Sequence, residues 1–134
     1  MKRRKFLGIT LMSAVAIPLP LAGCGSEGPF PPDDDETEAA RVLRAYLCAD
    51  GSALASARRI GTRYLARFGD EEEARTDLRP LVDRVLASAS TSDAITELEM
   101  SVTSDFEDLR VLAVAGWTLA ETEARICGVL AVAG

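Results

Sequence analysis

The helical spacing of apolar residues from Thr37 onward is the strongest constraint on the fold of this chain. Apolar side chains recur three or four residues apart in four stretches, so each stretch presents one apolar stripe. The stripes are Val42, Leu43, Tyr46 and Leu47; Leu54, Ala57, Ile60, Tyr64, Leu65 and Phe68; Leu78, Leu81, Val82, Val85 and Leu86; and Ile95, Leu98, Val102 and Phe106. They predict amphipathic helices that pack together, and 134 residues leave room for one domain of ordinary size.

Glycine and proline residues suggest where these helices end. We expect Gly51 to end the first helix and Gly69 to end the second, while Gly61 allows the second helix a close approach to a neighbour. Pro80 fits the third helix only if Asp77 is its cap, because a proline in the first turn needs no N–H. Residues 88–92 are predicted to form a turn.

The last part of the chain does not follow the helical spacing. Residues 109–117, LRVLAVAGW, are apolar and β-branched and predict a short extended segment before a last helix that ends near Leu130. Since one strand cannot pair with itself, we expect a buried connector; the alternative is an edge that accepts a strand from a partner. The predicted fold class is mainly α, a small bundle of about five helices with a short extended segment before the last.

Capping-box spacing supports two of these helix starts. Asp70 is followed three residues later by Glu73, and Thr118 is followed three residues later by Glu121. A polar side chain at the cap and a glutamate three residues later satisfy two backbone N–H groups at a helix start. Thr118 is therefore expected to begin the last helix.

The first 24 residues have a different composition. A basic start, Lys2 to Lys5, precedes an uncharged apolar run from Phe6 to Gly23 and then Cys24, which is the arrangement of an export signal. The run is short and is broken by Pro18 and Pro20, so it is poorly suited to span ~30 Å of hydrocarbon as a permanent helix.

The basic start resembles the core of twin-arginine signals, in which paired arginines and a following Phe-Leu are recognised by the Tat translocase. Lys2 and Gly8 depart from the residues usual beside that core, so export by the general secretory route is the alternative. The residues expected to be recognised are Arg3, Arg4, Phe6 and Leu7.

The sequence Leu21-Ala22-Gly23-Cys24 resembles a lipobox, which implies that Cys24 becomes the first residue and carries diacylglycerol. Each buried methylene contributes about 0.8 kcal/mol, so two or three acyl chains, palmitate for example, form a stable membrane anchor. We therefore expect a signal peptide (1–23), a lipidated cysteine with an acidic Pro/Gly tether (24–38) and a helical domain (39–134). The protein is expected in the cell envelope, anchored to the cell membrane or the outer membrane and facing the periplasm or the exterior. The alternative for Cys24 is a cysteine of the core.

The charge after Cys24 is strongly negative. All 21 acidic residues and only 11 of the 15 basic ones follow Cys24, which gives the mature chain a net charge of −10. Nucleic acid and bare anionic membrane are poor partners for such a domain, because both bind basic faces. Arg58, Arg59, Arg63 and Arg67 are expected to form a solvated face, with a docking patch as the alternative.

Three more residues carry sequence-based hypotheses. Trp117, the only Trp, is expected as a core anchor or, with Arg58 and Arg59, as a contact for a partner. Lipidation of Cys24 would leave Cys48 and Cys127 as a pair in an oxidising compartment. A disulfide between them would stabilise the domain by roughly 4.5 kcal/mol in the chain-entropy model. Two buried thiols are the alternative.

The residue types present exclude much catalytic chemistry. The chain has no His and no Lys after Lys5, so a Ser-His-Asp or Cys-His arrangement, a Ser-Lys pair and a Schiff base cannot be built. We assign no catalytic, cofactor-binding or metal-binding residue and expect no cofactor and no enzyme activity. An enzyme that uses carboxylates is the least favoured alternative.

The closing sequence GWTLAETEARIC, residues 116–127, resembles a motif of small Tat-signalled envelope proteins. A twin-arginine signal on a small helical domain is also similar to the small subunits of membrane dehydrogenases of the gluconate 2-dehydrogenase type. That resemblance is architectural and implies no functional residues. It implies a non-catalytic escort or small subunit for a larger exported oxidoreductase; the alternative is an independent structural or binding lipoprotein of the envelope.

Overall fold

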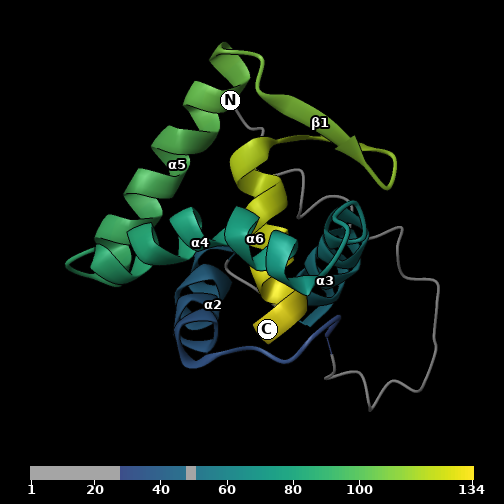
Figure 1. Cartoon of the computed structure of the whole chain (residues 1–134). Coiled ribbons are helices and arrows are strands. Elements are labelled where there is room, and N and C mark those ends of the chain that lie inside the picture. The colour runs from purple at the N-terminus through teal and green to yellow at the C-terminus, as the bar shows by residue number, and fades with distance from the viewer. Residues whose placement is uncertain (1–27, 48–50) are drawn as a thin grey trace.

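The structure is a computed structural model that describes residues 28–47 and 51–134 (Figure 1). The described part is mainly helical and contains five helices and one two-stranded sheet, which confirms the predicted fold class. In chain order the elements are α2 (Asp34–Leu47), α3 (Gly51–Leu65), α4 (Glu71–Ala87), α5 (Thr91–Glu107), β1 (Val111–Val114), β2 (Trp117–Ala120) and α6 (Glu121–Ala133). None of the described helices combines the length and apolarity that crossing a membrane requires.

Helix α6 forms the centre of the domain. It contacts all four other described helices, and Figure 1 shows it in yellow between them. Nearly every residue from Thr122 to Val132 is buried, as expected for a helix that is apolar around its whole circumference. The helix continues to Ala133, three residues beyond its expected end near Leu130.

Helices α3 and α6 approach closely at two glycines. At Gly128 a Cβ would meet the Leu65 and Tyr64 side chains of α3 at 3.4 Å and Leu78 of α4 at 3.0 Å, whereas a Cβ on Gly61 would lie 1.9 Å from the carbonyl oxygen of Cys127. Only a residue without a side chain fits at such a backbone crossing. The expectation that Gly61 allows a close approach is confirmed.

The start of α4 confirms the capping residues but not the role of Pro80. Asp70 caps the helix by accepting from the Glu73 amide at 2.9 Å, and Glu73 Oε1 accepts from the Gly69 amide at 2.6 Å. The helix then runs through Pro80, so the expectation that Asp77 is a cap is wrong. Pro80 is exposed, and water can reach the backbone that its missing N–H leaves without a partner.

The first helix also starts and ends differently from the expectation. Gly51 is the first residue of α3 and does not end α2. Helix α2 begins at Asp34, inside the expected tether, because Asp33 and Glu36 cap it reciprocally: Asp33 Oδ1 accepts from the Glu36 amide at 2.7 Å and Glu36 Oε1 accepts from the Asp33 amide at 3.0 Å. The described residues of that tether therefore belong to the folded domain.

Residues 111–120 form a β-hairpin, so the expected unpaired connector is wrong. Strands β1 and β2 are antiparallel, with Val114 opposite Trp117 and Val111 opposite Ala120. Ala115 (φ 53°) and Gly116 (φ 85°) join them in a two-residue turn with two positive φ angles, the kind that matches the twist of a hairpin. The strand that pairs with β1 is therefore β2, the next segment of the same chain.

The hairpin also moves the start of the last helix. Thr118 lies in β2, so the predicted cap at Thr118 is wrong, and α6 begins at Glu121. Glu123 Oε1 accepts from the Ala120 amide at 3.0 Å, which supplies half of a capping box. Ala120 has no side-chain acceptor for the other half, and that role passes to another helix, as described below.

Candidate functional site

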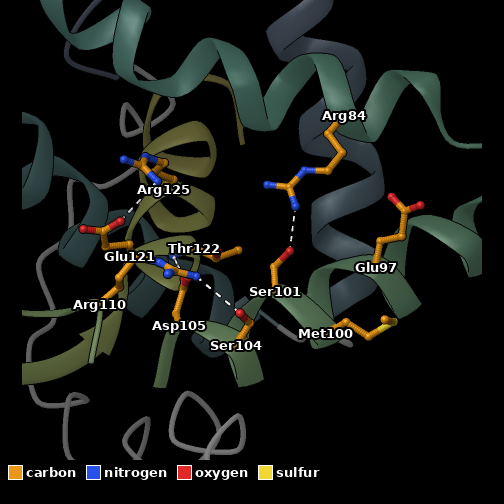
Figure 2. Close-up of a pocket in the computed structure, with 10 residues that line it drawn as sticks. All are labelled: Arg84, Glu97, Met100, Ser101, Ser104, Asp105, Arg110, Glu121, Thr122 and Arg125. Carbon is orange, nitrogen blue, oxygen red and sulfur yellow. Dashed lines mark hydrogen bonds and ion pairs between the residues drawn. The ribbon is translucent and has the colours of Figure 1, made fainter. Parts of the chain in front are cut away.

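A groove of about 520 Å³ lies where α4, α5 and the first turn of α6 meet (Figure 2). We call it the α5 groove, because that helix supplies half of its lining residues. Its walls include Arg84, Met100, Ser101, Asp105, Arg110 and Arg125.

Asp105 is the residue that builds the groove. It is 5% exposed, and its Oδ2 accepts a hydrogen bond from the Thr122 amide at 2.8 Å. Its Oδ1 accepts from Nε of Arg110 at 3.0 Å. A carboxylate favours the N-terminal end of a helix because the unpaired amides there carry partial positive charge. Asp105 therefore replaces the cap that Ala120 cannot provide, and it fixes α5 against α6.

Two of the three arginines in the groove are held by carboxylates. Arg110 also donates to Asp108 at 2.8 Å, and its hydrogen bonds to Asp108 and Asp105 raise the pKa of Arg110. Burial lowers the pKa of Arg125, but its two contacts with Asp77, at 3.2 and 3.3 Å, raise the pKa overall. Both guanidinium groups are charged parts of the wall.

Arg84 differs from these two arginines. Figure 2 shows its side chain extending from α4 toward α5, where Nη1 donates to Oγ of Ser101 at 2.6 Å. A hydroxyl is a neutral acceptor, and within the described ranges the ion pairs of the groove involve Arg110 and Arg125. The Arg84 side chain is exposed, so its charge can pair with a carboxylate of a bound molecule.

Three large apolar side chains in the groove or beside it in sequence are exposed. Among the residues that the structure describes, the exposed large apolar side chains are Met100 (65%), Leu109 (80%) and Val111 (36%). Met100 lines the groove, and the other two flank Arg110 in sequence. We call these three residues the apolar rim.

Leu109 also has an unusual backbone. Its φ is 62°, and it follows the C-cap of α5 in a Schellman motif: its amide donates to the Phe106 carbonyl at 3.2 Å, and the Arg110 amide donates to the Asp105 carbonyl at 2.8 Å. Glycine is the usual residue at this position because a Cβ is unfavourable at positive φ. The sequence signal that could have identified this site is Leu109 itself, a large apolar residue directly after the end of a helix, where glycine is usual.

The partner-contact residues expected from the sequence do not lie together. Trp117 is partly buried at the start of β2, beside the hairpin turn, and packs against the core. Arg58 lines a second cavity with Gly28 and Gly134, at the C-terminal end of α6. Arg59 is exposed on α3. None of the three lines the α5 groove.

Other candidate residues lie outside the described residues: Arg3, Arg4, Phe6, Leu7, Cys24 and Cys48. Cys127 is buried, and this burial raises the pKa of its thiol to about 12. A buried thiol with such a pKa is a poor nucleophile at neutral pH. The disulfide between Cys48 and Cys127 stays a prediction.

The groove offers three arginines, two serine hydroxyls and an exposed methionine, together with three carboxylates, Glu97, Asp105 and Glu121. Such a set suits recognition of a protein surface with an acidic side chain among apolar ones. Within residues 28–47 and 51–134, no three His, Cys, Asp or Glu side chains are grouped as metal ligands. Comparisons with protein-family models, curated proteins and solved structures found no match.

Proposed function

We propose that this protein is an exported lipoprotein, anchored through Cys24, which binds a larger co-exported protein as a non-catalytic escort or small subunit. The partner class is an oxidoreductase, on the architectural resemblance given above. The observation that carries the protein-binding role is Leu109, which is 80% exposed at a φ of 62°.

Leu109 is unfavourable for the domain in two respects. Its backbone conformation costs about 1–2 kcal/mol relative to glycine, and its exposed side chain buries little apolar surface within this domain. Residues kept in unfavourable conformations at the surface are concentrated at functional sites. A partner that covers Leu109 would recover the apolar burial that the domain itself lacks.

The residues around Leu109 fit the usual composition of a protein interface. Met100 and Val111 extend the apolar rim, and Arg84 offers a charge that a partner carboxylate can neutralise. Interfaces combine an apolar centre with arginine contacts of this kind. The rim and the groove lie at the N-terminal end of α6, whereas Gly28, four residues after Cys24, contacts its C-terminal end. The partner and the membrane would therefore bind at opposite ends of a 13-residue helix about 20 Å long.

The test is isolation of the membrane-expressed protein in mild detergent, with intact masses of the protein and its companions. The proposal expects diacylglycerol on Cys24 and one larger exported protein in stoichiometric amount. That companion should disappear from the envelope when Arg3 and Arg4 are both changed to lysine. A lipidated chain without any companion would contradict the escort role and leave an independent envelope lipoprotein.

A further inference from the structure

Gly28, four residues after Cys24, packs against the domain. A Cβ on Gly28 would lie 2.2 Å from the carbonyl oxygen of Ala131, so this backbone lies directly against the end of α6. Phe30 is partly buried, and the guanidinium carbon of Arg75 lies 4.8 Å from the centre of its ring. The Pro31 carbonyl accepts from Arg75 as well. Gly28 and Phe30 are therefore fixed parts of the domain.

Chain geometry then limits how far the domain can lie from its lipid. From Cys24 to Gly28 there are four peptide units, which span at most about 14 Å when fully extended. A lipid on Cys24 would thus hold the C-terminal end of α6 within that distance of the headgroups. Of the tether expected over residues 24–38, only the part before Gly28 can separate the domain from the bilayer. That part is too short to hold the domain away from the headgroups.

The N-terminal half of helix α3 lies at this same end of the domain. Arg58 lines the cavity that Gly28 also lines, and α3 packs along α6 from there to the crossing of Gly61 with Cys127. On the solvent side of this region, Arg59 and Arg63 are exposed one helical turn apart, and Arg67 is exposed just after the helix.

Charge is strongly divided between the helices. Residues 51–69 contain four arginines and no acidic residue, whereas residues 70–108 contain 12 acidic residues and three arginines. The net charge of −10 after Cys24 therefore conceals a basic surface on α3. A local basic surface attracts anionic lipid within about a Debye length, even on an acidic protein.

Two of the acidic residues near Gly28 are held by arginines. Asp33 pairs with Arg79 at 3.1 Å, and Glu36 pairs with Arg75 at 2.6 Å. Both arginines belong to α4, so these carboxylates are directed toward α4. Their charge is largely compensated there.

We propose that the exposed arginine face of α3, formed by Arg59, Arg63 and Arg67, lies against anionic lipid headgroups beside the anchor. The inference rests on the proposed lipidation of Cys24. It assigns the α3 face to the membrane and leaves the α5 groove at the other end of α6 open to a protein partner. The earlier expectation that anionic membrane is a poor partner then holds for the α4 and α5 surface only.

The test is arginine footprinting of the full lipidated protein in vesicles. The protein is reconstituted into phosphatidylcholine alone or into phosphatidylcholine mixed with phosphatidylglycerol, treated with phenylglyoxal and digested for mass spectrometry. We expect the modification of Arg59 and Arg63 to slow about fivefold in the anionic vesicles, which corresponds to ~1 kcal/mol per arginine near such a surface. High salt should remove the protection. Arg84, which is exposed on α4 in the α5 groove, is the internal control and should not change.

A matched pair of variants separates this contact from general charge effects. Arg63→Gln and Arg84→Gln each remove one exposed positive charge, but only Arg63→Gln should weaken the protection of Arg59. Lipidated protein that floats with both kinds of vesicle, but with the modification rates of Arg59 and Arg63, like that of Arg84, unchanged between the two, would overturn this inference and leave the anchor intact. Protein whose intact mass shows no lipid on Cys24 would overturn both the anchor and this inference.

Discussion

Oδ2 of Asp105, on α5, accepts a hydrogen bond from the backbone N–H of Thr122, in the first turn of α6, at 2.8 Å. The two residues are 17 positions apart, and the β-hairpin lies between them. One buried carboxylate thus caps the central helix, holds Arg110 and closes one end of the α5 groove.

Asp105→Asn should therefore destabilise the domain. The amide keeps the shape of the side chain but loses the charge and one of its two acceptor atoms, so either the Thr122 amide or Arg110 loses its partner. A buried donor left without a partner costs about 1–3 kcal/mol. Denaturant unfolding of the variant measures this loss. Asp108→Asn removes a carboxylate from the same arginine, but at an exposed site (57%), and should change little.

Gly61→Ala should be among the most damaging single changes. The added Cβ would meet three backbone atoms of Cys127 and Gly128 at 1.9 to 2.9 Å, and backbone cannot move aside as a side chain can. We expect a loss of about 3 kcal/mol or more in thermal or denaturant unfolding. Gly69→Ala is the control, because its Cβ would meet only the flexible Glu73 side chain, at 3.0 Å. Equal effects of the two substitutions would contradict the close crossing of α3 and α6.

Arg75→Ala should release the segment that precedes α2. Arg75 contacts Glu36 at 2.6 Å, and the Glu36 side chain is only 2% exposed. Removal of one partner of a buried ion pair leaves an uncompensated charge and costs about 3 kcal/mol or more. The variant should unfold at lower denaturant and be cut by protease near residues 28–33. Arg41→Ala removes an exposed ion pair. It should change neither the denaturant midpoint nor the protease cleavage near residues 28–33.

Acid should weaken the same region through Asp33. The Glu36 amide lowers the pKa of Asp33 below its ordinary 3.8, and Arg79 and Arg75 add to this effect while burial opposes it. A carboxyl group with a lowered pKa stabilises the fold above its unfolded pKa, and this contribution is lost as the pH falls through its folded pKa. The melting temperature of the wild type should thus fall more steeply below about pH 4 than that of Asp33→Asn. Asp34→Asn removes a charge nearby and should keep the wild-type slope.

Local patterns were sufficient for the helices but not for the hairpin. The apolar stripes located α4 and α5, and Asp70 with Glu73 identified the start of α4. Residues 111–120 were misread because Ala-Gly is a weaker turn signal than Asn-Gly, so the second strand was assigned to the beginning of a helix. Pro80 was misread because a proline on an exposed helical face is tolerated where water reaches the freed backbone.

The groove could not be predicted, because three separate elements build it. Arg84, Asp105 and Arg125 are far apart in sequence, and only the packing of α4 and α5 on α6 brings them together. Leu109 could have been identified, since it follows a helix end without a glycine or asparagine. Composition suggested an acidic domain, and only the positions of the helices revealed a basic face on α3.

Leu109→Gly should stabilise the domain and weaken partner binding at the same time. Relief of the positive φ should contribute about 1 kcal/mol, which raises the melting temperature by about 4–8 °C in a domain of this size. Ala115→Gly is the matched control, because Ala115 also has a positive φ (53°) but lies in the hairpin turn. Both variants should melt higher than the wild type, and only Leu109→Gly should retain less partner during isolation from membranes. Equal partner retention by both variants would contradict the inference that Leu109 lies in the interface with the partner.

The most direct test of the account is photocrosslinking in cells with a photoreactive amino acid at position 109. The control position is Ala66, which is exposed immediately after α3 on the face assigned to the membrane. We expect position 109 to form one prominent adduct with a larger exported protein and position 66 to form no such adduct. The absence of a protein adduct from position 109, or the same adduct from both positions, would contradict a partner site at the apolar rim.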